Sequence, residues 1–200
     1  MIHKLLRYLI VYPYARWLSF RKNLTIHNSH VWEELSPPYV LLANHAAFLD
    51  SIYLIRATPH TFTICGARPK YFSRWYWRTL MWLLQIIKVE HRPTYLDDCQ
   101  RLLQQGTPIL IYPEMQRNKE SMGPFKTWAA EVALRQPVTL IPAYIYGTTK
   151  GQRGPIQVIF GEPFQANPNQ DPESLTQDFR QRIQHLADSL VSDQDTPEQP

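Results

Sequence analysis

The chain has 200 residues, 44% of them hydrophobic, so it is long enough and apolar enough to fold around one sizeable core. Its two cysteines argue against a disulfide framework and show no metal-ligand spacing, which favours a reducing, cytoplasmic setting. Residues 1–161 carry 19 Lys and Arg against 9 Asp and Glu, whereas residues 162–200 carry 2 against 8. Such a basic front region suits an anionic surface: membrane lipid, nucleic acid or a phosphorylated substrate.

An amphipathic helix is predicted for residues 1–22. Apolar residues recur there with the spacing of one helical face, basic residues lie opposite, and Pro13 is expected to end or kink the helix. Such a helix suits a membrane interface, although packing on its own domain is the alternative. No apolar run is long enough to span a bilayer, and the terminus is a poor signal peptide. We therefore predict a peripheral protein on the cytoplasmic side of a membrane.

Strands and helices alternate through the rest of the chain. Strands are predicted at 24–27, 39–43, 61–65, 86–89, 108–112, 138–146 and 156–160, and helices near 50–57, 71–84, 94–105, 125–135 and 173–190. This alternation predicts a single α/β domain over residues 23–190, with a mostly parallel sheet flanked by helices. Residues 191–200 form an acidic, apolar-poor end that is predicted to be a disordered tail.

A polar segment follows the strand at 39–43, where open α/β sheets usually place ligands. His45 can take a proton from a hydroxyl, and Asp50 can fix the imidazole tautomer and stabilise its charged form. Residues five apart do not share a helical face, so the two meet only if His45 lies in the turn and the helix begins near Asp50. The alternative is that Asp50 merely caps this helix and His45 is an ordinary loop residue.

A second polar segment, Pro113–Asn118, follows the strand at 108–112. Glu114 and Arg117 lie three residues apart, so they can hold each other or present a guanidinium to a phosphate. Residues 74–82 mix aromatics with arginines, which suits either a lipid–water interface or a helix with its aromatics in the core. A basic patch is also predicted, which can contact anionic lipid or an acidic carrier protein, or simply be a solvated face: Arg68, Lys70, Arg74, Arg78, Lys88 and Arg92.

In this order the motifs resemble those of the glycerolipid acyltransferase family, of the bacterial 1-acyl-glycerol-3-phosphate acyltransferase type. The Asn-His-x4-Asp block of that family is matched by Asn44, His45 and Asp50, and its Pro-Glu-Gly-Thr-Arg-Ser block is similar to Pro113–Asn118. The other similar segments are Val89–Arg92, Phe125–Lys126, Leu140–Ala143 and Phe160–Phe164. The resemblance covers roughly residues 20–165.

The resemblance implies transfer of an acyl group from acyl-CoA or acyl carrier protein to the hydroxyl of a lysophospholipid such as 1-acyl-glycerol-3-phosphate. His45 is then the general base and Asp50 its partner, with direct attack and no acyl-enzyme. The residues expected to bind the acceptor are Asn44, Arg92, Glu114, Arg117 and Lys126, the two arginines and the lysine on its phosphate. The expected partners are thus a membrane surface, the donor and the acceptor, with no cofactor, metal or nucleic acid.

Three residues depart from the pattern of the family near the expected acceptor site. Met115 and Gln116 replace Gly and Thr, and Trp128 stands where a small glycine is usual. Glycine allows a positive φ that methionine resists. Two alternatives to lysophospholipid acylation therefore remain: the enzyme acts on a different lipid acceptor, or the protein binds lipid and has lost its activity. An esterase or metal hydrolase is disfavoured, because the chain has neither a Gly-x-Ser-x-Gly nor a His-Glu-x-x-His motif.

Overall fold

The protein is described by a computed structural model that covers residues 5–119, 121–149, 152 and 154–194. Its centre is an eight-stranded sheet in the order β1-β7-β6-β2-β5-β3-β4, with β8 beside β6. Only β6–β7 and β6–β8 are antiparallel pairs within the described sheet. The strands are Thr25–His27 (β1), Tyr39–Ala43 (β2), Thr63–Ala67 (β3), Ile86–Lys88 (β4), Ile109–Ile111 (β5), Thr139–Tyr146 (β6), Gln157–Phe160 (β7) and Phe164–Gln165 (β8). The predicted α/β fold with a mostly parallel sheet is confirmed.

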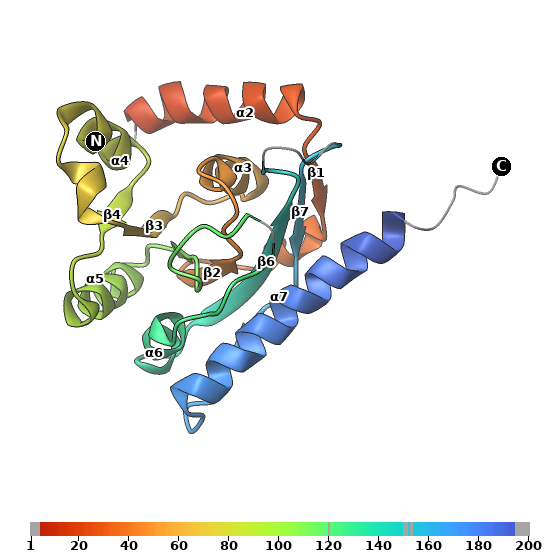
Figure 1. The fold of residues 1–200 in the computed structure, drawn as a ribbon. Coiled ribbons are helices and arrows are strands. Elements are labelled where there is room, and N and C mark those ends of the chain that lie inside the picture. Colours follow the sequence, from red (N-terminus) through yellow and green to blue (C-terminus); the bar gives the residue numbers. More distant parts are fainter. Residues whose placement is uncertain (1–4, 120, 150–151, 153, 195–200) are drawn as a thin grey trace.

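Helices cover both faces of the sheet (Figure 1). The α-helices are Tyr12–Arg21 (α2), Asp50–Ala57 (α3), Trp75–Leu83 (α4), Arg92–Gln104 (α5), Trp128–Leu134 (α6) and Pro172–Gln194 (α7). Short helical segments are Arg7–Val11 (η1), Ser29–Trp32 (η2) and Pro69–Phe72 (η3). Helices α2 and α3 pack in the core on one face, and α5, α6 and α7 in the core on the other. Helix α4 packs beside the edge strand β4.

Strand β2 shows why this arrangement places polar chemistry at a strand end. All five of its residues are buried, with Leu41 in the core under α3 and Val40 and Leu42 in the core under α5 and α6. A strand covered on both faces must be apolar throughout, which explains its uninterrupted hydrophobic run. The first positions available for polar function are therefore Asn44 and His45, just beyond its end.

The amino-terminal helix continues through the predicted break. Residues 7–11 form a π-helical turn, and Pro13 lies in the first turn of α2, where a missing backbone N–H is tolerated. The inner face of the helix buries Val11, Ala15 and Leu18 in the core that contains α3. The helix thus packs on its own domain along one face, and its other face is exposed.

The strand predicted at 61–65 lies at Thr63–Ala67, and two other predicted elements differ further in the structure. The helix expected at 71–84 is divided into η3 and α4, which begins only at Trp75. Helix α7 reaches Gln194, so it includes part of the segment 191–200 that was predicted as a disordered tail; residues 195–200 lie outside the described residues. None of the described helices combines the length and the hydrophobicity of a transmembrane span.

Candidate active site

The ends of three neighbouring parallel strands bring polar residues to one edge of the sheet. The strands β2, β5 and β3 are adjacent in that order, so their carboxyl ends lie side by side. His45 follows β2, Tyr112 and Glu114 follow β5, and Arg68 follows β3. A cavity of about 480 Å³ opens at this edge, and His45, Arg68 and Tyr112 line it. This is the position where open α/β sheets usually bind ligands.

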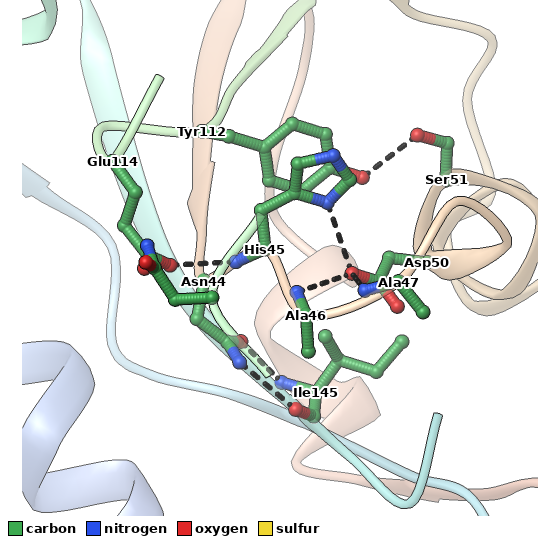
Figure 2. A network of polar contacts seen from close by, with 10 residues as sticks. Asn44, His45, Ala46, Ala47, Asp50, Ser51, Tyr112, Glu114 and Ile145 are labelled. Atoms are coloured by element: carbon green, nitrogen blue, oxygen red, sulfur yellow. Dashed lines mark hydrogen bonds and ion pairs between the residues drawn. The ribbon is translucent and has the colours of Figure 1, made fainter. Parts of the chain in front are cut away.

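The side chains of His45 and Asp50 meet, as the sequence predicted (Figure 2). The Nδ1 atom of His45 lies 3.0 Å from Oδ2 of Asp50, and the same oxygen accepts the backbone N–H groups of Ala46 at 2.7 Å and Ala47 at 2.8 Å. Asp50 is the first residue of α3, is fully buried, and ties down the preceding turn. Because a carboxylate only accepts, Nδ1 carries the proton, which leaves Nε2 of His45 unprotonated and able to accept one.

Tyr112 fixes the imidazole from a second side. Its ring stacks on that of His45, with centroids 4.0 Å apart and planes inclined by 15° (Figure 2). Its hydroxyl lies 2.8 Å from Oγ of Ser51, and burial raises its pKa well above the ordinary value, so the ring stays neutral. Neither Tyr112 nor Ser51 was among the site residues predicted from the sequence. The sequence does indicate them by position, because Tyr112 directly precedes Pro113 and Ser51 directly follows Asp50.

Glu114 holds the backbone at His45. It is only 2% exposed, and its Oε1 accepts the backbone N–H of His45 at 2.7 Å. Its Oε2 accepts the backbone N–H of Gly123 at 2.7 Å and the side-chain amide of Asn118. Glu114 was expected to bind the acceptor, but the structure places it behind His45 and outside the cavity lining. We therefore describe it as a positioning residue.

Asn44 also faces the protein. Its amide nitrogen donates to the carbonyl of Ile145 at 3.0 Å, and its amide oxygen accepts the N–H of Ile145 at 2.7 Å (Figure 2). This pair joins the end of β2 to β6 and fixes where the chain turns toward His45. The buried amide thus donates to and accepts from the backbone of Ile145, which gives Asn44 a role in positioning the loop.

The expected phosphate ligands separate into two groups. Arg117 lines the cavity, donates to the hydroxyl of Tyr71 at 2.6 Å and lies over the ring of Phe48. Arg92 instead begins α5 and forms an ion pair with Glu131 that raises the pKa of Arg92. The side chain of Lys126 is exposed, and neither Arg92 nor Lys126 lines the cavity.

Two other basic side chains line the cavity, where Arg92 and Lys126 do not. Arg68 and Lys70, which the sequence assigned only to a broad basic patch, both line the cavity with Arg117. Lys70 lies 5.4 Å from the ring centroid of Tyr71. The strand register shifts between Cys65 and Ala67, just before Arg68, and such irregularities redirect the chain that follows. Three cations from two loops thus share a cavity with His45.

The residues that depart from the motif form part of the wall of the cavity. Met115, Gln116 and Trp128 all line it, and Trp128 packs against the ring of Tyr95 with centroids 5.4 Å apart. Met115 has a φ of 54°, the left-handed conformation that favours glycine. The backbone of this segment therefore keeps a glycine-like shape even though methionine occupies it. The rest of the wall includes apolar side chains: Ile64, Met81, Leu84, Ile86 and Val89.

The fold and the site together define a class of protein. Members of this class are α/β proteins with a histidine–carboxylate pair in which one ring nitrogen can accept a proton. Their cavity has both apolar and cationic walls. Such a site can activate a hydroxyl on an amphiphilic ligand. Residues 23–146 match the family model described as Acyltransferase, so the chain belongs to the acyltransferase family.

Curated relatives carry names from the same family. The chain is 29% identical over 170 residues to the 1-acyl-sn-glycerol-3-phosphate acyltransferase of Chlamydomonas reinhardtii, a match covering 76% of this chain and 50% of that protein. It is 28% identical over 126 residues to a chloroplastic enzyme of that name from Brassica napus, covering 56% of this chain and 34% of that protein. The chain therefore spans half the length or less of these relatives.

A solved structure has the same fold. The 1-acyl-sn-glycerophosphate acyltransferase of Thermotoga maritima superimposes with a TM-score of 0.74 at 16% sequence identity. The match covers 90% of this chain and 78% of the Thermotoga chain. The family and the fold that the sequence motifs predicted are both confirmed.

Proposed function

We propose that this protein transfers a fatty acyl group from a thioester donor to the hydroxyl of a lysophospholipid of the 1-acyl-glycerol-3-phosphate class. The observation that carries this proposal is the 3.0 Å contact between His45 Nδ1 and Asp50 Oδ2, beside a cavity that Arg117 also lines. Membership of the acyltransferase family and the names of the relatives support the same reaction.

In the proposed reaction His45 is the general base. Its Nε2 takes the proton of the acceptor hydroxyl while that oxygen attacks the thioester carbonyl. The new C–O ester bond forms, the C–S bond breaks, and the proton passes from His45 to the departing thiolate. Buried Asp50 stabilises the imidazolium that exists between these steps. The stacked ring of Tyr112 holds the imidazole in its orientation. General-base catalysis of this kind contributes about 10²–10⁴ in rate.

A covalent acyl-enzyme is not needed in this proposal. Ser51 and Cys65 are the serine and the cysteine that line the cavity among the described residues. The hydroxyl of Ser51 is bonded to Tyr112, and burial raises the pKa of the Cys65 thiol well above its ordinary value. Neither is paired with His45, so direct transfer between the two substrates is the simpler route.

The phosphate of the acceptor is assigned to Arg117, Arg68 and Lys70. These three side chains line the same cavity as His45, whereas Arg92 is engaged by Glu131. A guanidinium presents several N–H donors in a fixed plane that matches phosphate oxygens. The apolar side chains of the cavity then accept the hydrocarbon part of a substrate. Acyl-CoA and acyl carrier protein both remain donors of suitable chemistry.

We place the protein at the cytoplasmic face of a membrane, bound through its amino-terminal helix. Large apolar side chains on the outer face of this helix are exposed, namely Leu5, Tyr8, Leu9, Ile10, Tyr14, Trp17 and Phe20. Arg16, Arg21 and Lys22 lie beside them, and no acidic residue precedes Glu33. An apolar face bordered by cations is typical of helices that lie in the interface of an anionic bilayer.

The proposal is tested by an acylation assay with both thioester donors and a series of lysolipids. His45→Ala should lower the rate by at least about 10²-fold, because it removes the proposed general base. Circular dichroism should show that the variant stays folded. Wild-type rates in His45→Ala contradict the mechanism. Tight lysolipid binding without turnover by any donor would instead identify a lipid-binding protein that has lost its activity.

A further inference from the structure

Exposed large hydrophobic side chains occur in only two segments of the described chain. Seven of the ten belong to the amino-terminal helix, and the other three lie on α4. On α4, Trp75 is 75% exposed, Tyr76 43% and Trp82 47%. Single exposed apolar residues are ordinary, but a cluster of aromatic side chains on one short helix marks a contact surface.

The charge around α4 matches an anionic lipid surface. No acidic residue occurs from Ser51 to Val89, whereas six basic residues do. Two of them, Arg74 and Arg78, are exposed on or next to α4, and Arg74 donates to the hydroxyl of Tyr76. Trp, Tyr and Arg are the side chains that gather where hydrocarbon meets lipid headgroups, and nearby cations are attracted to anionic lipid.

The opposite face of α4 belongs to the candidate active site. Met81, in α4, and Leu84, at its end, line the cavity. Trp77 packs edge-on against Phe48, with ring centroids 5.8 Å apart, and Phe48 lies in the turn between His45 and Asp50. One short helix therefore separates the cavity from an exposed aromatic surface.

The two exposed segments adjoin each other. Arg7, at the start of η1, is only 2% exposed, and its Nη1 donates to the carbonyl of Phe62 at 3.0 Å and to the side chain of Gln85. Gln85 directly follows Leu84, the carboxyl cap of α4. Figure 1 likewise shows the start of the described amino-terminal helix near α4. The buried guanidinium thus holds the beginning of the amino-terminal helix against the end of α4.

We propose that α4 is a second membrane-contacting helix, whose outer aromatic face lies among the headgroups of an anionic bilayer. Together with the amino-terminal helix it forms one docking surface that places the cavity at the bilayer. The lysolipid then enters the cavity from the membrane and does not have to cross water. This inference rests on the proposed function for the identity of the ligand, but its membrane contact is measurable separately.

The test uses the full chain with Trp75→Ser, Tyr76→Ser and Trp82→Ser combined, and vesicles of mixed phosphatidylcholine and phosphatidylglycerol. Vesicle affinity should fall about tenfold or more, because three interfacial aromatic side chains are lost. Acylation of a long-chain lysophosphatidate in the vesicles should fall in proportion. Acylation of a short-chain, monomeric lysophosphatidate should stay unchanged, because these side chains lie outside the cavity lining.

A charge-matched pair of variants separates electrostatic binding from a general change in charge. Arg74→Gln with Arg78→Gln should weaken binding to the anionic vesicles and leave binding to pure phosphatidylcholine unchanged. The control, Arg101→Gln with Arg180→Gln, removes the same charge from exposed positions on α5 and α7 and should have much less effect.

Unchanged vesicle affinity in the triple aromatic variant would overturn the inference. An equal loss of turnover on the monomeric acceptor would also overturn it, because the aromatic side chains would then act on the cavity itself. If the wild-type protein acylates no lysolipid, the proposed function fails. Loss of vesicle affinity in the triple variant would still support the membrane contact of α4.

Discussion

The turn that carries His45 and the cationic side of the cavity are built by different means. In the turn, the side chains of Asn44, Asp50 and Glu114 all bind backbone N–H or carbonyl groups. On the cationic side, Arg117 contacts side chains, the hydroxyl of Tyr71 and the ring of Phe48. The position of His45 is therefore fixed by hydrogen bonds to the backbone at the sheet edge. In the proposed function, the acceptor phosphate is bound by these loop side chains, which can change without disturbing the turn that carries His45.

The largest effect that tests this comparison is expected at Glu114. Glu114→Ala leaves the backbone N–H groups of His45 and Gly123 without their acceptor, which should lower the free energy of unfolding by about 2–5 kcal/mol. The acylation rate should fall more than about 10²-fold, because the base loses its fixed position. Urea denaturation and the acylation assay measure both effects.

Glu114→Gln is the matched control. It keeps one carbonyl oxygen that can accept the N–H of His45, so it should retain more stability than the alanine variant. Equal stability and rate in Glu114→Ala and the wild type would show that the turn does not depend on this carboxylate.

A smaller effect, limited to binding, is expected at Arg117. Loss of a charged hydrogen bond costs about 1.5–3 kcal/mol, so Arg117→Ala should raise KM for the phosphorylated acceptor about 10–100-fold with a smaller change in kcat. Arg92→Ala should change KM less than about twofold, because that side chain is paired with Glu131 away from the cavity. If both variants behaved alike, the phosphate would have to be bound elsewhere.

A still smaller effect, on kcat, is expected at Tyr112. Tyr112→Leu removes the ring that stacks on His45, and such contacts contribute about 0.5–1.5 kcal/mol, so kcat should fall about 3–10-fold. Tyr112→Phe keeps the stack and loses only the bond to Ser51, so its kcat should stay closer to that of the wild type. The two variants differ in whether the ring stack on His45 is kept. A larger loss of kcat in Tyr112→Phe would mean that the hydroxyl, and not the stack, supports turnover.

The smallest effect is expected at Met115. Met115→Gly removes a side chain from the cavity and relieves a left-handed conformation that costs a non-glycine residue about 1 kcal/mol. Acceptors with larger headgroups should gain a few-fold in relative kcat/KM. Met115→Ala, which widens the cavity but keeps the strained backbone, separates the two causes. An unchanged ratio in both variants would mean that Met115 does not select the acceptor.

The sequence by itself determined the features that depend on local pattern. The apolar run of β2 is continuous because both of its faces are covered, and the start of α3 at Asp50 follows from the requirement that His45 lie in the turn. The order of the motifs also identified the family. The predicted helix at 71–84 was less accurate, since the separation of η3 from α4 leaves no mark on apolar periodicity.

Only the tertiary structure decided which polar side chains reach the cavity. Arg92 and Arg117 look equivalent in sequence, yet Glu131, 39 residues from Arg92, holds Arg92 away from the cavity, while the adjacency of β5 and β3 brings Arg117 and Arg68 to it. The side chain of Asn44 likewise faces the protein interior, because its amide hydrogen-bonds to the backbone of Ile145 in β6. These outcomes depend on which strands are neighbours and on contacts between residues distant in sequence, which periodicity and spacing do not encode.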